Sequence, residues 1–157
     1  MDNKEIERKY LVDGDFRQEV YKSMHIVQGY LCAAPGRTVR VRICDDKAWL
    51  TIKGARRTGE LARFEWEKEI LVEDARQLLE LAETGLIDKT RHLVHNTDGV
   101  HVWEIDEFHG AHEGLVVAEI ELQSETDTFD KPSWLGKDVT DDHHYANSWL
   151  AGVDGTC

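Results

Sequence analysis

The chain has 157 residues, enough for one domain with a sizeable core, and 32% of them are charged. Its 19 lysines and arginines stand against 31 aspartates and glutamates, which gives a formal net charge of −12. A nucleic-acid backbone or an anionic membrane selects a basic surface, so neither is expected as a partner. The N-terminal residues carry no apolar signal-peptide core, and no apolar run is long enough to span a membrane. We therefore predict a single domain over residues 1–157 that resides in the cytoplasm.

Taken in order, the chain contains eight segments in which polar and apolar residues alternate. This alternation predicts strands, because successive side chains of a strand point to opposite faces. The predicted strands span residues 4–12, 25–32, 38–44, 47–54, 60–71, 86–96, 100–108 and 115–124. Turn sequences separate several of them, such as Pro35-Gly36 and Thr97-Asp98-Gly99.

Three segments predict helices. The clearest is residues 72–84, where Ala75, Leu78, Leu79 and Ala82 form an apolar stripe. A shorter helix is expected over residues 15–23, with Phe16, Val20 and Met24 on one side, and another over residues 141–151.

Charged residues occupy one face of nearly every predicted strand, at strict two-residue spacing. The opposite faces are rich in Trp, Phe, Ile, Val and Leu, which need cover. Eight antiparallel strands can close into a barrel, which removes unpaired edges. We therefore predict an α+β, mainly β fold: a closed eight-stranded antiparallel barrel with a few flanking helices and charged faces lining its lumen. The alternative is an ordinary β domain whose charged faces are solvated.

Basic and acidic residues lie on different strands of this predicted lumen, which suits two occupants of opposite charge. The candidate cations are Lys9, Arg40, Arg42, Lys53, Arg63, Lys89 and Arg91; the candidate anions are Glu5, Glu7, Glu65, Glu67, Glu104, Asp106, Glu119 and Glu121. Arginine and lysine bind phosphoryl oxygens, and carboxylates without Cys or His favour Mg²⁺ or Mn²⁺. The residues by themselves thus indicate a short polyphosphate bound together with divalent metal ions.

The first strand, Glu5-Ile6-Glu7-Arg8-Lys9, resembles the E-x-E-x-K signature of the CYTH, or triphosphate tunnel metalloenzyme, superfamily. Seven further segments resemble the motifs of that family in the same order: Gln28-Gly29-Tyr30-Leu31, Val39-Arg40-Val41-Arg42, Leu50-Thr51-Ile52-Lys53-Gly54, Phe64-Glu65-Trp66-Glu67, Lys89-Thr90-Arg91, Glu104-Ile105-Asp106 and Ala118-Glu119-Ile120-Glu121. The match spans essentially the whole chain and is closest in kind to the short, bacterial tripolyphosphatase-like members.

The resemblance implies a hydrolase that acts on phosphoanhydride bonds with a divalent metal. Its simplest small-molecule substrate would be inorganic tripolyphosphate, cleaved to pyrophosphate and phosphate. The family pattern places the triphosphate on Lys9, Arg40, Arg42, Lys53, Arg63, Lys89 and Arg91, and metal on Glu5, Glu7, Asp106, Glu119 and Glu121. It gives catalytic roles to Glu65, Glu67 and a Tyr30–Lys53 pair. The 141–151 helix would be a lid on the tunnel.

Other functions are weighed against this one. Thr38 stands where thiamine triphosphatases of the family place a stacking Trp, which disfavours thiamine triphosphate. A class IV type adenylate cyclase and a nucleoside triphosphatase are further alternatives, although no adenine pocket is evident. A non-catalytic polyphosphate-binding module is the alternative of another class, and the many carboxylates argue against it. The apolar outer faces are compatible with a homodimer.

Two histidine pairs fall outside these motifs. His109-x-x-His112 and His143-His144 have no third ligand at a metal-site spacing in the sequence, so we expect them to be surface histidines.

Overall fold

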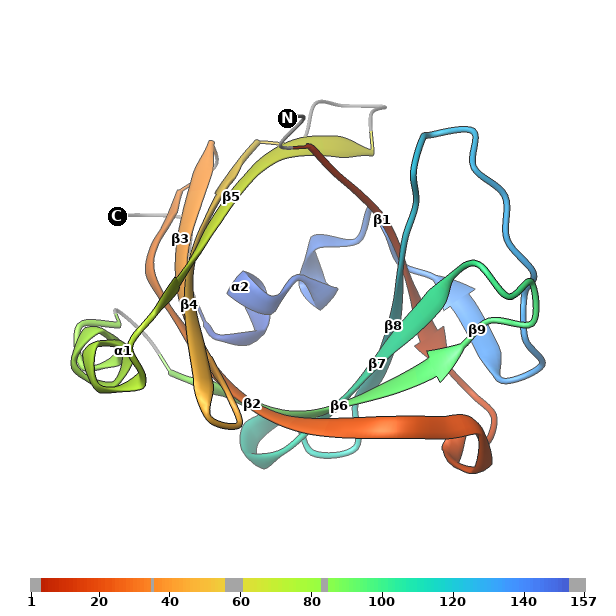
Figure 1. Cartoon of the computed structure of the whole chain (residues 1–157), viewed down its shortest axis with the longest axis horizontal. Helices are drawn as coiled ribbons and strands as arrows, with labels where there is room; N and C mark the ends of the chain where they lie inside the picture. The colour runs from red at the N-terminus through yellow and green to blue at the C-terminus, as the bar shows by residue number, and fades with distance from the viewer. Residues whose placement is uncertain (1–3, 35, 56–60, 83–84, 153–157) are drawn as a thin grey trace.

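The computed structural model describes residues 4–34, 36–55, 61–82 and 85–152. Within these ranges, antiparallel strands form one sheet: β1 (Lys4–Val12), β2 (Val20–Ala34), β3 (Arg37–Cys44), β4 (Lys47–Gly54), β5 (Ala62–Ile70), β6 (Ile87–His95), β7 (Val102–Phe108), β8 (Val116–Glu121) and β9 (Leu135–Asp138). Neighbouring strands follow the order β5-β4-β3-β2-β6-β7-β8-β1, and β1 also pairs with β5. The pairing of β1 with β5 closes the sheet, so the predicted eight-stranded antiparallel barrel is confirmed (Figure 1).

β1 completes the barrel because its two ends have different neighbours. Lys4, Glu5 and Ile6 pair with β5, whereas the stretch from Glu7 to Leu11 pairs with β8. The C-terminal end of β1, at Tyr10 and Val12, also pairs with the short strand β9. The charged signature of the first strand therefore lies at the seam where the barrel closes.

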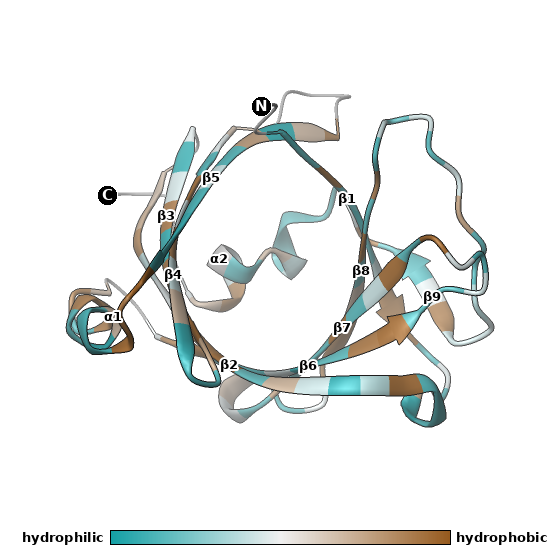
Figure 2. Ribbon diagram, viewed as in Figure 1, coloured by the Kyte–Doolittle hydropathy of each residue, from teal (hydrophilic) through white to brown (hydrophobic). Residues whose placement is uncertain are grey.

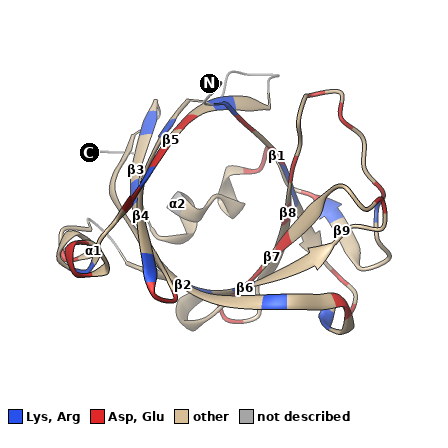
Figure 3. Ribbon diagram, in the orientation of Figure 1, with Lys and Arg blue, Asp and Glu red and all other residues tan. Residues whose placement is uncertain are grey.

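Lys, Arg, Asp and Glu recur along the strands of the barrel (Figure 3), and the charged faces of these strands line its cavity, as the alternation predicts. Residues directly opposite each other in an antiparallel pair share a face of the sheet. Lys9 lies opposite Glu119 and Glu7 opposite Glu121 between β1 and β8, and both pairs face the lumen. Hydrophobic and hydrophilic residues alternate along the barrel strands (Figure 2). The apolar residues pack on the outer face, much of which the rest of the chain covers, while Phe64 and Trp66 of β5 stay exposed.

Two apolar clusters hold the outside of the barrel. One contains Trp103 and its neighbours on β1, β7 and β8, covered by Phe16, Phe129 and Trp134. The other packs helix α1 (Val72–Leu79) on β2, β3 and β4 through Ala75. Gly29 of β2 permits a close approach here, since a Cβ atom would lie 2.8 Å from Leu86 and 3.1 Å from Ala82.

The C-terminal tail packs inside one end of the barrel. Helix α2 (Asn147–Leu150) lies across the barrel opening in Figure 1. Leu150, Ala151 and Tyr145 contact the inward-facing side chains of Tyr30 and Phe108. One end of the lumen is thereby filled with apolar side chains, and the polar space lies in the remainder.

The predicted helix over residues 15–23 is wrong. Only Arg17–Glu19 form a 3-10 turn, and β2 begins at Val20, which pairs with Val94 of β6. Phe16, Val20 and Met24 are spaced by four residues, which fits both a helical and a two-residue period, so the sequence pattern could not separate them. Long-range pairing with β6 decides for the strand.

Two predicted helices are shorter or divided in the structure, and one strand was not predicted. Helix α1 ends at Leu79 and continues only as a turn, in which the Ala82 N–H donates to the Leu79 carbonyl over 3.1 Å; residues 83–84 of the predicted helix lie outside the described ranges. The helix predicted over residues 141–151 is a 3-10 turn, His143–Tyr145, followed by α2, because Ala146 between them is extended. Strand β9 was not predicted, since its four residues are too few to show an alternation.

None of the helices in the described ranges combines the length and the apolar character needed to cross a bilayer.

Trp103 tests the importance of the outer cluster. It is fully buried and meets the rings of Tyr10 and Trp134 edge-on at centroid distances of 5.9 and 5.4 Å. We expect Trp103→Ala to lower the free energy of unfolding by about 3–5 kcal/mol, because it leaves a large cavity. Urea denaturation measures this loss. The control is Trp66→Ala on β5, where the ring is 37% exposed; equal losses for both variants would contradict the prediction.

Candidate active site

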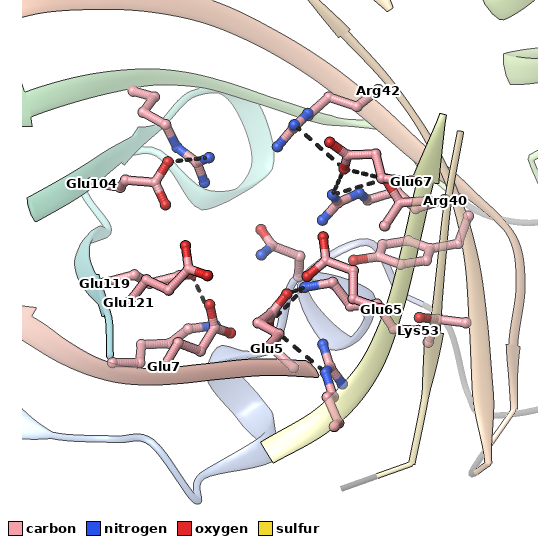
Figure 4. Close-up of a pocket in the computed structure, with 18 residues that line it drawn as sticks. Glu5, Glu7, Arg40, Arg42, Lys53, Glu65, Glu67, Glu104, Glu119 and Glu121 are labelled. Carbon is pink, nitrogen blue, oxygen red and sulfur yellow. Dashed lines mark hydrogen bonds and ion pairs between the residues drawn. The ribbon is translucent and has the colours of Figure 1, made fainter. Parts of the chain in front are cut away.

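The polar part of the lumen is a cavity of about 280 Å³. Figure 4 shows Glu7, Glu119 and Glu121 at one side and Arg40 and Arg42 at another, with their charged ends turned toward the cavity. All but two of the predicted site residues line it: Glu5, Glu7, Lys9, Tyr30, Arg40, Arg42, Lys53, Arg63, Glu65, Glu67, Arg91, Glu119 and Glu121. The exceptions are Lys89 and Asp106.

Carboxylates crowd together where β1 and β8 pair. Glu7 lies opposite Glu121 in the register and shares a side-chain hydrogen bond with Glu119. Burial and the nearby charges of Glu119 and Glu5 raise the pKa of Glu7 well above its ordinary value. Burial and the charges of Glu5 and Glu104 raise the pKa of Glu121 as well. Both shifts favour the protonated forms of these two carboxyl groups.

A second carboxyl pair joins β1 to β5. Burial raises the pKa of Glu5, but the hydrogen bond with Glu65 and the charges of Lys53 and Arg63 outweigh it and bring the pKa to about 2. Glu65 carries the opposite shift, since burial together with the hydrogen bond and charge of Glu5 raises its pKa to about 8. At neutral pH Glu65 is thus a protonated donor to an ionised Glu5.

The Lys53 ammonium bonds to the same Glu5, over 3.0 Å to Oε1 and 2.7 Å to Oε2. A catalytic role for the predicted Tyr30–Lys53 pair stays a prediction. Tyr30 lines the cavity, but the Lys53 ammonium donates to the carboxylate and not to the phenol. The two residues share the lumen without forming a hydrogen-bonded pair.

Arg40 and Arg42 of β3 form the basic side. Their Nη2 atoms each lie 3.9 Å from the Glu67 carboxylate, which also accepts a 2.7 Å hydrogen bond from Thr51. Burial and the neighbouring charges of Arg40 and Arg91 lower the pKa of Arg42. The Nε atoms of Arg40 and Arg42 are buried and make no hydrogen bond. Each of these guanidinium groups thus has one N–H donor without a partner.

Lys89 and Asp106 lie beneath the cavity wall, at 1% and 2% exposure. Asp106 accepts from Lys89 Nζ over 2.7 Å and from Arg91 Nε and Nη2 over 2.8 and 2.9 Å. Both carboxylate oxygens of Asp106 thus accept hydrogen bonds, and its role as a metal ligand stays a prediction. Asp106 also fixes the guanidinium of Arg91, whose Nη1 bonds to Glu104. Burial lowers the pKa of Lys89 to about 8, against the attraction of Asp106.

The tail contacts two of the predicted phosphate-binding lysines. The Lys9 ammonium donates to the Tyr145 carbonyl over 3.0 Å and lies 3.4 Å from Glu119. The Lys89 ammonium donates to Asn147 Oδ1 over 3.1 Å. Residues 145–147 thus reach into the site from the apolar end of the barrel.

The sequence analysis did not assign four of the residues that the structure brings to the site. Thr51 and Asn147 line the cavity and bond to Glu67 and Lys89. Thr51 shares the inward face of β4 with Lys53, so the alternation could have found it; Asn147 comes from the tail and had no such signal. Gln28 is fully buried on the inward face of β2, opposite Arg42, and neither its oxygen nor its nitrogen has a partner. Ala146 completes the lining.

A second cavity of about 190 Å³ adjoins the first, and Glu5, Glu7, Lys9 and Arg63 line both. Its other walls come from Leu61 and from the tail: Thr140, Asp141, Asp142, His143 and Ala146. The carboxylates at the barrel seam are therefore accessible from two sides.

The donors of the acidic side fit a hard divalent cation. Glu5, Glu7, Glu119 and Glu121 offer only carboxylate oxygens, and none of the described residues that line the main cavity is a histidine or a cysteine. Oxygen donors of this kind suit Mg²⁺ or Mn²⁺ and not the softer metals. Burial is the main cause of the raised pKa values of Glu7 and Glu121, and the like charges of neighbouring carboxylates add to it, so a bound cation would be favoured here.

The sequence matches the model of a known protein family. The family model of the CYTH domain matches residues 3–148. The chain belongs to the CYTH domain family. The CYTH resemblance of its strand motifs is thereby confirmed over nearly the whole chain.

Two proteins with established names are similar in sequence to this chain. The chain is 45% identical over 148 residues to an inorganic triphosphatase of Acetivibrio thermocellus, covering 94% of this chain and 92% of that protein. It is 33% identical over 151 residues to an inorganic triphosphatase of Nitrosomonas europaea, covering 94% and 96%. A crystal structure of an inorganic triphosphatase superposes with a TM-score of 0.67 at 32% identity, covering 94% of this chain and 93% of that one.

The raised pKa of Glu65 predicts an unusual dependence of stability on pH in metal-free protein. The folded chain keeps a proton on Glu65 up to a pKa of about 8, whereas the unfolded chain loses it near the ordinary value of 4.5. Between these values the folded state binds more protons, so the free energy of unfolding falls as pH rises. Glutamine mimics the protonated carboxyl, so Glu65→Gln should remove this contribution.

The measurement is urea denaturation of wild type and Glu65→Gln in EDTA at pH 5, 7 and 9. We expect the wild type to lose stability relative to the variant as pH rises. Glu69→Gln, farther along the inward face of β5 and exposed, is the matched control and should follow the wild type. Parallel curves for wild type and Glu65→Gln would contradict the assignment.

Proposed function

We propose that this protein is a divalent-metal-dependent inorganic triphosphatase that hydrolyses tripolyphosphate to pyrophosphate and phosphate inside its barrel. One observation carries the proposal: a single cavity holds a crowded group of carboxylates on β1 and β8 and a crowded pair of arginines on β3. A metal ion would relieve the first and a polyphosphate the second. The names of the two relatives, both inorganic triphosphatases, support the same substrate.

The basic residues would hold the phosphate chain. Arg40 and Arg42 present unused guanidinium donors, which suit bidentate contact with phosphoryl oxygens. Lys9, Lys53 and Arg63 extend the positive charge toward the barrel seam. Phosphoryl transfer depends mainly on positioning and on neutralising oxygen charge, which these residues supply.

The acidic residues would serve the metal and the water. Glu5, Glu7, Glu119 and Glu121 would hold Mg²⁺ or Mn²⁺, which when bound would neutralise charge on the reacting oxygens. Glu65 and Glu67 face the centre of the cavity and would orient the attacking water. Because its pKa is raised to about 8, Glu65 would meet the water as a protonated carboxyl near neutral pH and would accept a proton only above this value. Asp106 and Lys89 would keep Arg91 in place from beneath the wall.

Several finer properties stay predictions. A class IV adenylate cyclase or a nucleoside triphosphatase would need a site for a base, and the main cavity is lined by polar residues with Tyr30 as its one aromatic side chain. A binding module for polyphosphate would need no cluster of carboxylates.

We also propose a single catalytic domain over residues 1–157, a cytoplasmic location and, from exposed Phe64 and Trp66 on β5, a homodimer.

The test is phosphate release from tripolyphosphate, ATP and thiamine triphosphate with Mg²⁺, with Mn²⁺ or with EDTA. We expect rapid, metal-dependent release from tripolyphosphate, slower release from ATP and least from thiamine triphosphate. Formation of a cyclic nucleotide and pyrophosphate from ATP would replace the proposal with the cyclase. Tight tripolyphosphate binding without turnover would replace it with the binding module.

Gln28 provides a further prediction about this site. A buried amide without partners destabilises a fold by about 1–3 kcal/mol, so its position opposite Arg42 suggests a ligand that arrives with the substrate. We expect Gln28→Met to be at least as stable as wild type in urea, while kcat/KM for tripolyphosphate falls about tenfold through one lost hydrogen bond. Gln123→Met, at an exposed position, is the control. Loss of stability and activity together would make Gln28 a structural residue.

A further inference from the structure

The tail carries a group of possible metal ligands outside the main cavity. Asp142, His143 and His144, here called the tail triad, each offer one ligand atom, and these atoms lie within 4.8 Å of one another. In the sequence, His143-His144 lacked a third ligand. The fold supplies it, because the 3-10 turn that begins after Asp142 brings its carboxylate to the two rings.

The triad is already partly organised. Asp142 Oδ1 accepts hydrogen bonds from the backbone N–H of His144 over 3.1 Å and lies 2.8 Å from His144 Nδ1. The rings of His143 and His144 lie 4.1 Å apart, and the ring of Trp149 meets both edge-on, at 5.1 and 4.9 Å. A tetrahedral ion with ligand distances near 2.1 Å needs its ligands about 3.4 Å apart, which exposed side chains reach by small rotations.

We propose that the tail triad is a second metal site, selective for a borderline ion such as Zn²⁺, Ni²⁺, Co²⁺ or Cu²⁺. Two imidazole nitrogens and one carboxylate oxygen suit these ions, whereas the main cavity offers carboxylate oxygens and no histidine. Mg²⁺ takes oxygen ligands and keeps its waters, so it does not compete for nitrogen donors. The two sites therefore separate metals by ligand chemistry.

The location gives the triad access to the catalytic machinery. Asp142 and His143 line the second cavity, whose far wall is formed by Glu5, Glu7 and Lys9. Tyr145, the next residue after the triad, accepts the hydrogen bond of the Lys9 ammonium. An ion held by the triad would fix the segment that contacts Lys9, at the rim of the smaller cavity.

The experiment uses full-length protein without a histidine tag, kept in saturating Mg²⁺ so that the carboxylate site is filled. Zn²⁺ titration calorimetry and Cu²⁺ electron paramagnetic resonance then report the second site. We expect one Zn²⁺ per chain, a Cu²⁺ signal with nitrogen hyperfine splitting, and quenching of Trp149 fluorescence by Cu²⁺. Since none of these readouts measures turnover, their outcome is independent of the proposed hydrolysis.

The variant is His143→Ala/His144→Ala, which should weaken Zn²⁺ binding at least about tenfold and remove the nitrogen splitting. His25→Ala is the matched control, because His25 is as exposed as His144 and also pairs with one carboxylate, Asp88; it should bind like wild type. Trp149→Phe should remove the quenching and keep the splitting. An all-oxygen Cu²⁺ signal, or nitrogen splitting that survives the double substitution, would overturn the proposal.

Discussion

Arg42→Ala is expected to lower kcat/KM for tripolyphosphate by roughly 10³-fold or more, the usual effect of removing a preorganised charge from a phosphoryl-transfer site. Arg42 has a buried Nε without a partner, and burial and its arginine neighbours lower its pKa, so it is poised for an anion. Steady-state phosphate release measures the loss.

Arg42→Lys distinguishes charge from geometry at this position. Lysine keeps the charge but loses the planar fork that contacts two oxygens, so we expect a smaller loss, about 10–100-fold. Lys47→Ala, at an exposed position at the start of β4, is the control and should behave as wild type. Similar rates for wild type and Arg42→Ala would remove Arg42 from the phosphate-binding group.

Glu7→Gln is expected to lower the metal-dependent rate by at least about 100-fold. Removing a ligand of the metal takes away several kcal/mol of the stabilisation that the metal gives the transition state. The same variant should fold normally in EDTA. Burial and the charges of Glu119 and Glu5 raise the pKa of Glu7, so the neutral glutamine side chain relieves the same burial and repulsion. Mn²⁺ titration calorimetry and urea denaturation in EDTA measure the two effects separately.

The contrast between these two measurements identifies the role of Glu7. Loss of Mn²⁺ binding with unchanged stability would indicate a ligand, whereas loss of stability in EDTA would indicate a structural residue. Glu69→Gln on β5 again serves as the control for removing one carboxylate. Retention of full Mn²⁺ affinity by Glu7→Gln would contradict the assignment of the acidic side as the metal site.

The alternation of charged and apolar residues was enough to predict the barrel and most of its lining. Arg40/Arg42, Glu65/Glu67 and Glu119/Glu121 all face the cavity, because a two-residue spacing on a strand fixes a common face. The same rule could not separate residues that reach the open cavity from those beneath its wall. Asp106 follows the two-residue spacing, but its carboxylate is buried and accepts hydrogen bonds from Lys89 and Arg91.

Local sequence failed where long-range contacts decide the structure. Phe16, Val20 and Met24 fit two periods equally, and only the pairing of β2 with β6 makes that segment a strand. The tail residues Tyr145 and Asn147 show no strand or helix period that would place them in the site, and their contacts with Lys9 and Lys89 come from a chain that returns into the barrel.

The sequence by itself therefore determined the strands, their inward faces and the two kinds of charge that those faces bring together, since these depend on the local period of the backbone. The tertiary structure alone decided which charges are paired. Glu5 is bound by Lys53 and Asp106 by Arg91, whereas Arg42 and Gln28 have donors without partners. The reason is physical: the free energy of a buried charge depends on its neighbours in space, and those are set by barrel closure and by the tail inside it.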